Sequence, residues 1–305
     1  MRWDDFRRSD NIDDYRDSGG GGGGGFNIGG GGGLGIGAIV VLSLVGWAFG
    51  IDPSILIGGA EMVSGNRTQY QQPYRPAPGQ TGAPKDQMGD FVAATLGNTE
   101  DVWTKIFEEN GRTYRAPRLA LYRGSLQNGG CGLARAAMGP FYCPRDRRIY
   151  LDTSFFNDMR VRFKGCSGKA CEFAEAYVIA HEVGHHVQKL LGILDKAHDA
   201  QAASGSKAGA NRIQVRVELQ ADCFGGVWAN RSSQKWKTIE PGDAEAALQT
   251  ASAIGDDRLQ KQAQGYVVPD SFTHGSSVQR QRWFNIGLKE GKVSACNTFA
   301  QGAQL

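Results

Sequence analysis

The chain has 305 residues, with 34 lysines and arginines against 31 aspartates and glutamates and a formal net charge of +3. It contains no dense basic stripe with interleaved aromatic residues, so we expect no nucleic-acid binding. The length permits one large domain or two, and the uneven composition separates an unusual N-terminal part from the rest of the chain.

The first 33 residues predict a disordered, glycine-rich tail. Residues 1–17 mix arginines with aspartates and offer little apolar surface to bury. Glycine tracts at 19–25 and 29–33 follow, and such tracts act as flexible tethers rather than as secondary structure.

Residues 34–51, LGIGAIVVLSLVGWAFGI, are apolar and about long enough to cross a hydrocarbon core of ~30 Å. The alternatives are a signal peptide cleaved after the run 48–50, or a buried core helix. A signal peptide normally has a short basic start, and this start is long and slightly acidic, which favours an uncleaved transmembrane helix. Arginines are more frequent before the segment than after it. This bias predicts a single-pass protein of the inner (cytoplasmic) membrane, with its N-terminus in the cytoplasm and its bulk in the periplasm or outside the cell.

The six cysteines agree with an oxidising compartment. Short loops favour the pairs Cys131–Cys143 and Cys166–Cys171, which leaves Cys223 to pair with Cys296. A cysteine-zinc site and free buried thiols are the alternatives, although no C-x-x-C pair occurs.

Residues 52–88 are rich in proline, glutamine and glycine and predict a linker, so a globular domain is expected at 89–305. Apolar spacing at 91–96 and 102–107 predicts two helices with a break at Gly97–Asn98. Alternation and aromatic or β-branched residues at 114–123 and 141–152 predict strands, and hence a small sheet.

The most informative stretch is His181-Glu182-Val183-Gly184-His185, which lies inside a helical pattern at 172–191 that Gly192 is suited to cap. Histidines four residues apart on a helix project from one face and can bind one metal ion. Glu182 lies off that row, where it can reach a metal-bound water without binding the metal itself. The alternative is an ordinary buried helix whose histidines are satisfied by hydrogen bonds.

A second helical pattern at 213–229 places Glu218 and Asp222 on one face among apolar residues. The alternative is a solvated edge, with an arginine such as Arg212 or Arg216 nearby. Amphipathic patterns at 243–254 and 278–288 predict helices that complete the core. Three tryptophans are read as packing residues: Trp228, Trp236 and Trp283.

The motif His181-Glu182-x-x-His185 followed by Glu218-x-x-x-Asp222 resembles the zinc site of thermolysin-like peptidases. The runs VIAHEVGHHVQ, VELQADCFGGVWA and DSFTHGSSVQRQRWF are similar to the bacterial, membrane-anchored neutral zinc metallopeptidase family, over about residues 89–300. The glycine-rich tail and the apolar segment are also typical of that group. The resemblance implies that Glu218 is the third ligand of a single zinc ion.

The chemistry of such a site gives the other residues roles. Zinc held by two neutral imidazoles and one carboxylate keeps an open position for water, whose pKa it lowers to about 7. Glu182 would act as general base and return the proton to the leaving amine. Asp222 is placed to accept the other ring N–H of a ligand histidine, for which we favour His181. Gly184 leaves room for the second helix.

His274, in a loop just ahead of the pattern at 278–288, is the expected donor to the oxyanion, with a surface or capping histidine as the alternative. His186 and His198 are not expected to bind the metal. The sequence thus predicts an α+β, zincin-like domain acting on protein or peptide substrates as a zinc-dependent endopeptidase. A zinc-binding but non-catalytic scaffold or chaperone-like module is the main alternative, and a hydrolase of non-peptide amides is a third.

Overall fold

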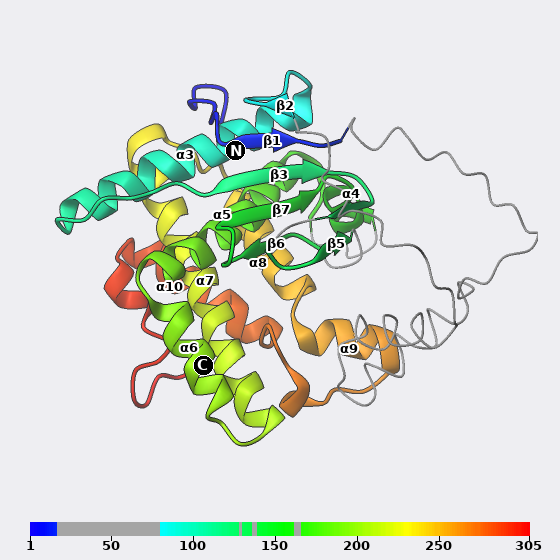
Figure 1. Ribbon diagram of the computed structural model, residues 1–305. Coiled ribbons are helices and arrows are strands. Elements are labelled where there is room, and N and C mark those ends of the chain that lie inside the picture. The colour runs from blue at the N-terminus through cyan, green and yellow to red at the C-terminus, as the bar shows by residue number, and fades with distance from the viewer. Residues whose placement is uncertain (17–79, 128–129, 136–138, 162–165) are drawn as a thin grey trace, which may run out of the picture. The chain divides into compact units, whose positions relative to one another are not determined.

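The computed structural model describes residues 1–16, 80–127, 130–135, 139–161 and 166–305. Within these residues a small sheet lies against a larger set of helices, which confirms the expected mixed α+β class (Figure 1). The predicted glycine tracts, the apolar segment 34–51 and most of the predicted linker lie outside the described residues. Among the helices of the described residues, none combines the length and the apolar character that a bilayer crossing requires.

The main sheet mixes parallel and antiparallel strands in the order β2-β1-β3-β7-β6. Its strands are β1 Ile12–Asp14, β2 Gln80–Thr81, β3 Arg118–Tyr122, β6 Phe141–Cys143 and β7 Arg148–Asp152. A separate hairpin consists of β4 Ser125–Gln127 and β5 Leu133–Arg135. The strand predicted at 141–152 is therefore two antiparallel strands, and Arg147 in the turn between them has a φ of 54°.

The side chains of the central strands β3 and β7 pack alternately into two apolar clusters, because successive side chains of a strand point to opposite faces of the sheet. One set faces the core formed with the helices: Leu119, Leu121, Ile149 and Leu151. The other set packs in a smaller cluster with residues of the β4–β5 hairpin: Ala120, Tyr122 and Tyr150 with Leu126 and Ala134. These two central strands are thus buried on both faces.

The N-terminal segment belongs to the fold, so the prediction of a disordered tail is wrong for residues 1–16. Strand β1 pairs with β2 and, in parallel, with β3, and Met1, Phe6 and Ile12 are buried. Isolated apolar residues among charges carry no periodic signal, and their burial depends on a surface supplied much later in the chain. Strand β1 is thus a strand of the domain's own sheet.

Helix α3, Gln87–Glu109, is continuous, whereas the sequence predicts two helices with a break at Gly97–Asn98 and a domain that starts at residue 89. A Cβ on Gly97 would lie 2.2 Å from the carbonyl oxygen of Arg7, so glycine is needed there for the N-terminal segment to approach. The Asn98 side chain accepts hydrogen bonds from Trp228 and Ser232, at 2.8 and 2.7 Å. Gly97 and Asn98 thus serve contacts with other segments and do not interrupt the helix.

Arginines of the N-terminal segment pair with acidic residues of α3. The Arg7 guanidinium lies 2.6 Å from the Glu100 carboxylate, and that of Arg8 lies 2.7 Å from Asp90. These arginines are among those that suggested a cytoplasmic N-terminus. In the fold they hold the segment against the domain.

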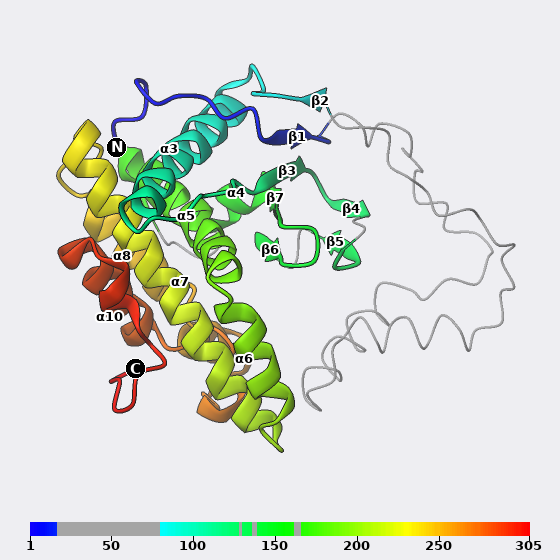
Figure 2. The same cartoon turned by 60° about the vertical axis from the view of Figure 1, so that its left-hand side comes forward.

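Two long helices lie at the centre of the helical layer, α5 Cys171–Leu190 and α7 Lys207–Trp236. Figure 2 shows α7 running between α5 and α10, Ser277–Glu290. A Cβ on Gly184 would lie 3.0 Å from the Ala221 carbonyl oxygen, so this glycine allows α5 and α7 to approach closely, as predicted. The other helical elements are α4 Ser154–Val161, η2 Gly168–Ala170, α6 Ile193–Ala202, α8 Asp243–Ala253, α9 Asp256–Gln264, η3 Pro269–Ser271 and η4 Val293–Cys296.

The three predicted disulfides are confirmed: Cys131–Cys143, Cys166–Cys171 and Cys223–Cys296. The last one joins α7 to η4 near the C-terminus and closes a loop of 73 residues. Trp228 and Trp283 are buried, in agreement with their predicted packing role, and Trp236 is partly buried.

Candidate metal centre

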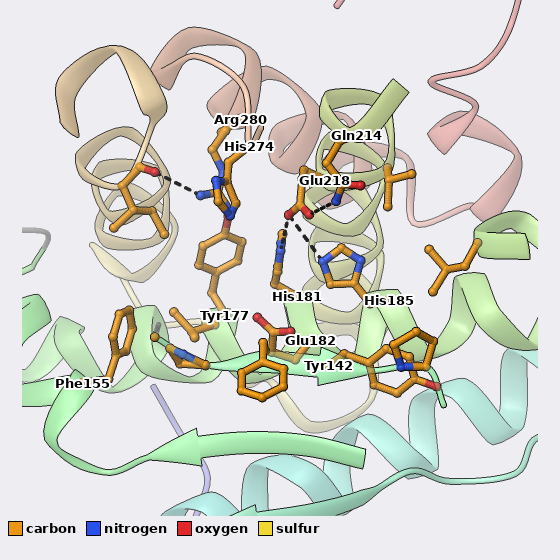
Figure 3. A pocket seen from close by; sticks show the side chains of 18 of the residues that line it. Tyr142, Phe155, Tyr177, His181, Glu182, His185, Gln214, Glu218, His274 and Arg280 are labelled. Atoms are coloured by element: carbon orange, nitrogen blue, oxygen red, sulfur yellow. Dashed lines mark hydrogen bonds and ion pairs between the residues drawn. The ribbon is translucent and has the colours of Figure 1, made fainter. Parts of the chain in front are cut away.

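Three side chains from two helices converge on one point. His181 and His185 lie one turn apart on α5, and Glu218 faces them from α7 (Figure 3). The Nε2 atoms of the two histidines lie 3.2 and 3.4 Å from the same carboxylate oxygen, Glu218 Oε2. The three donor atoms all lie within 4.8 Å of one another. The structure therefore brings together the three residues that the sequence suggested as ligands.

These donors fit a tetrahedral zinc ion. Bonds of roughly 2.0–2.2 Å to nitrogen and oxygen place neighbouring donors of a tetrahedral ion about 3.4 Å apart, close to the two observed nitrogen–oxygen separations. Charge agrees: among the described residues, the buried side chains around this point include three carboxylates, of Glu182, Glu218 and Asp222, and one guanidinium, of Arg280. A divalent cation would balance the excess negative charge.

The ligand residues perturb one another strongly. Burial lowers the pKa of His181, but the nearby carboxylates of Asp222 and Glu218 outweigh burial and raise this pKa from 6.5 to about 10. Burial raises the pKa of Glu218, but His185 and His181 together bring it well below its usual value. The second oxygen of Glu218 accepts a hydrogen bond of 2.7 Å from Gln214, one turn earlier on α7. The carboxylates around the two histidines thus favour a positive charge at the point where the three side chains meet.

Asp222 anchors the first histidine. Its Oδ1 atom lies 2.7 Å from His181 Nδ1 and accepts hydrogen bonds from Tyr177 at 2.5 Å and from Arg280 at 2.8 Å. Arg280 donates through Nε to the other oxygen at 2.9 Å. With a carboxylate at Nδ1, His181 carries its hydrogen there and presents Nε2 toward Glu218. This is the contact that the sequence suggested for Asp222.

Glu182 lies beside the cluster and lines a cavity of about 520 Å³, which the cluster residues also line. Within the described part of the chain its carboxylate accepts no hydrogen bond. Burial raises the pKa of this carboxyl group, against the opposing effect of His181. A substrate in the cavity would therefore face this carboxylate and the His181, His185 and Glu218 side chains together.

His274 lines the same cavity and is held by Asp256 at the start of α9. The imidazole Nδ1 lies 3.3 Å from Asp256 Oδ1, and the backbone N–H groups of Thr273, His274 and Gly275 all donate to Oδ2. Burial lowers the pKa of His274, but Asp256 raises it above its usual value. Nε2 can donate only when the ring is protonated, a state that this shift favours, and the side chain remains about half exposed.

The other two histidines of the region lie away from the ligand point. His186 is buried between Tyr142, whose hydroxyl contacts Nδ1 at 3.0 Å, and the Arg115 carbonyl, which contacts Nε2 at 2.6 Å. Burial lowers its pKa to about 4, so it is a neutral structural residue. His198 on α6 lies at the exposed rim of the cavity.

Sequence reasoning missed the residues that hold the ligands and His274 in place, namely Tyr177, Gln188, Gln214, Asp256 and Arg280. Gln214 has a usable signal, because it precedes Glu218 by one turn on the same helix face. Arg280 lies on a different helix, far along the chain, and no spacing rule connects it to Asp222.

The chain is similar to known proteins over most of its length. A family model described as "Putative neutral zinc metallopeptidase" matches residues 1–299. The chain is 46% identical over 302 residues to "Uncharacterized protein YpfJ" of Escherichia coli K12, covering 99% of both proteins. It is 41% identical over 231 residues to "Uncharacterized protein Rv2575" of Mycobacterium tuberculosis H37Rv, covering 72% of this chain and 74% of that protein. No solved structure shows a significant match.

Proposed function

This chain belongs to the neutral zinc metallopeptidase family, and on that premise we propose that it is a zinc-dependent endopeptidase with a zincin-like domain. The observation that carries the proposal is the convergence of His181, His185 and Glu218 on one point at the wall of a cavity. Two imidazoles and a carboxylate are a ligand set that leaves a catalytic zinc ion one open position.

Zinc bound there would polarise a carbonyl group and make a water molecule nucleophilic near neutral pH. The protein's own residues would handle the protons. Glu182, beside the ligands but bonded to none of them, is placed to take a proton from the attacking water and to pass it to the leaving amine. Asp222 holds His181 in the tautomer that keeps Nε2 free for the metal.

His274 would stabilise the oxyanion that forms on the attacked carbonyl. Asp256 fixes the ring through Nδ1, and in the protonated ring Nε2 can donate a hydrogen bond into the cavity. The raised pKa of His274 supports this role, because a protonated imidazole stabilises developing negative charge better than a neutral one.

The zinc content and cleavage activity of the full chain test this function. The wild-type protein should bind one zinc ion and cleave denatured proteins or peptides in a way that chelators abolish. Glu182→Gln should keep zinc and lose cleavage, whereas Glu218→Ala should lose zinc. Cellular function that persists in Glu182→Gln would instead indicate a zinc-binding scaffold, and activity on non-peptide amides alone would move the enzyme to another substrate class.

An oxidising location outside the cytoplasmic membrane is part of the proposal. Its support is the three disulfides, since such bonds persist in extracytoplasmic compartments. Thiol titration of the protein purified from cells without reductant tests this location, because free thiols at these six positions would contradict it.

A further inference from the structure

His185, the second histidine of the cluster, has a partner of a different kind from His181. Its Nδ1 atom lies 2.9 Å from the side-chain oxygen of Gln188, one turn later on α5. The Gln188 side chain is completely buried. An amide, unlike a carboxylate, has both a donor end and an acceptor end, so its orientation decides which hydrogen His185 carries.

The orientation of this amide follows from its neighbours. Gln220 donates to the Cys296 carbonyl oxygen at 2.8 Å, and that oxygen can only accept. The side-chain oxygen of Gln220 therefore faces Gln188, whose NH₂ group donates to it at 3.0 Å and to the Val217 carbonyl at 2.8 Å. Both hydrogens of the Gln188 amide are used, and its oxygen must face His185.

The tautomer of His185 is then determined. The Gln188 oxygen can only accept, so Nδ1 carries the hydrogen and Nε2 keeps its lone pair. That Nε2 atom is the one directed at Glu218, at 3.4 Å. The hydrogen bonds thus run in one direction, from His185 through Gln188 and Gln220 to the Cys296 carbonyl, which accepts the last one. We call this series the amide relay.

The amide relay also joins the two helices that carry the ligands. Gln188 lies on α5, while Val217 and Gln220 lie on α7, on either side of Glu218. Its far end is fixed covalently, because Cys296 forms a disulfide with Cys223 of α7. His181 is held by the charged Asp222–Arg280 pair, whereas His185 is held by a neutral chain that ends at a cross-link.

We propose that Gln188 is a positioning residue of the metal site, and that it holds His185 in the Nδ1–H tautomer through the amide relay. The inference rests on the proposed zinc function. Partners of this kind typically contribute 10–100-fold to metal affinity. They do so by fixing ring orientation and tautomer, without contact with the metal or the substrate.

Zinc affinity of the full chain, measured by competition with a chromophoric chelator, tests the role directly. Gln188→Leu removes both ends of the amide at similar volume and should weaken zinc binding by about 10–100-fold. Gln220→Leu removes one of the two acceptors that orient the Gln188 amide and leaves the Val217 carbonyl, so it should weaken binding less. Asn98→Leu removes a buried amide that bonds α7 far from the ligands, and should leave zinc affinity unchanged whatever it does to stability.

The imidazole NMR signals of the zinc-bound protein supply a second readout that a merely structural role would not move. The wild type should show a slowly exchanging Nδ1–H on His185, and Gln188→Leu should lose that protection. If the wild type binds zinc and both relay variants bind it with the same affinity, this inference is overturned but the proposed function is not. A wild type that binds no zinc would overturn the proposed function and this inference with it. If Gln188→Leu does not fold, Gln220→Leu decides.

Discussion

Arg280 donates to both carboxylate oxygens of Asp222, at 2.8 and 2.9 Å, and both side chains are almost fully buried. The guanidinium holds the pKa of Asp222 well below its usual range, although burial alone would raise it. The charge that orients His181 is thus compensated by a residue on α10.

Arg280→Met should therefore leave a buried carboxylate without its main counter-charge. We expect the free energy of unfolding to fall by about 3–5 kcal/mol, as when one partner of a buried ion pair is removed. Chemical denaturation of the metal-free protein measures this loss. The exposed neighbour Arg282→Met is the control and should stay within about 0.5 kcal/mol of wild type. Equal stability of the two variants would contradict the assignment.

Replacing each of two adjacent glycines of α7 by alanine should change the free energy of unfolding in opposite directions. A Cβ on Gly226 would lie 2.1 Å from the Phe284 carbonyl oxygen of α10, so Gly226→Ala should force the helices apart and cost about 1–3 kcal/mol or more. A Cβ on Gly225 meets only ordinary contacts, with Tyr177 at 3.5 Å, so Gly225→Ala should gain about 0.5–1 kcal/mol. Thermal unfolding of the two variants compares them directly.

Glu175 on α5 should make stability depend on pH. Burial raises its pKa from 4.5 to about 7, with Arg160 opposing the shift. The folded state then binds more protons than the unfolded state between these values, so stability should fall as pH rises from about 4.5 to 7, by at most about 3 kcal/mol. Glu175→Gln should flatten this part of the profile. Denaturation midpoints across pH 4–8 measure it, with the exposed change Glu245→Gln as the control.

His274→Ala should lower kcat by about 10²–10³ with little change in KM, because an oxyanion donor acts mainly in the transition state. Asp256→Asn keeps an acceptor for the loop N–H groups but loses the charge that raises the pKa of His274. Its loss of kcat should be smaller, and the alkaline limb of its pH profile should move to lower pH. Asp270→Asn, in the exposed η3 turn, is the control. A rise in KM with an unchanged kcat would instead indicate a role in substrate binding.

Replacing residues 20–75 with a short glycine-serine linker should leave the domain folded, because Met1–Gly19 and Pro76–Leu305 form one compact unit. Removing residues 1–16 from the full chain should instead cause severe destabilisation, since it takes away β1 and exposes the apolar surface that Phe6 and Ile12 cover. Circular dichroism and thermal melting compare the two proteins. A stable protein lacking residues 1–16 would contradict the described role of the segment.

The sequence predicts the parts of the site that lie within one helix. His181 and His185, and likewise Glu218 and Asp222, are four residues apart, and helical geometry alone places each pair on one face. The two helices and the two short-loop disulfides were predictable for similar local reasons, whereas Cys223–Cys296 followed as the remaining pair. The meeting of the helices was suggested by resemblance rather than by periodicity.

What the sequence does not predict depends on contacts between distant segments. Gly97 looks like a helix break but is the place where the Arg7 backbone packs on a continuous helix. Phe6 and Ile12 look like stray apolar residues in a polar tail. Arg280 looks like one charge on an amphipathic helix, and only the packing of α10 against α7 brings it to Asp222.

Strands β1 and β2 lie side by side, with Asp14 opposite Gln80, so the chain leaves and re-enters the domain at one edge of the sheet. A polypeptide whose two ends are joined in this way can traverse a bilayer only an even number of times. A single crossing by the intervening residues would put β1 and β3 on opposite sides of the bilayer, which their pairing does not allow. Reporter tags at Met1 and at Leu305 should therefore register the same compartment.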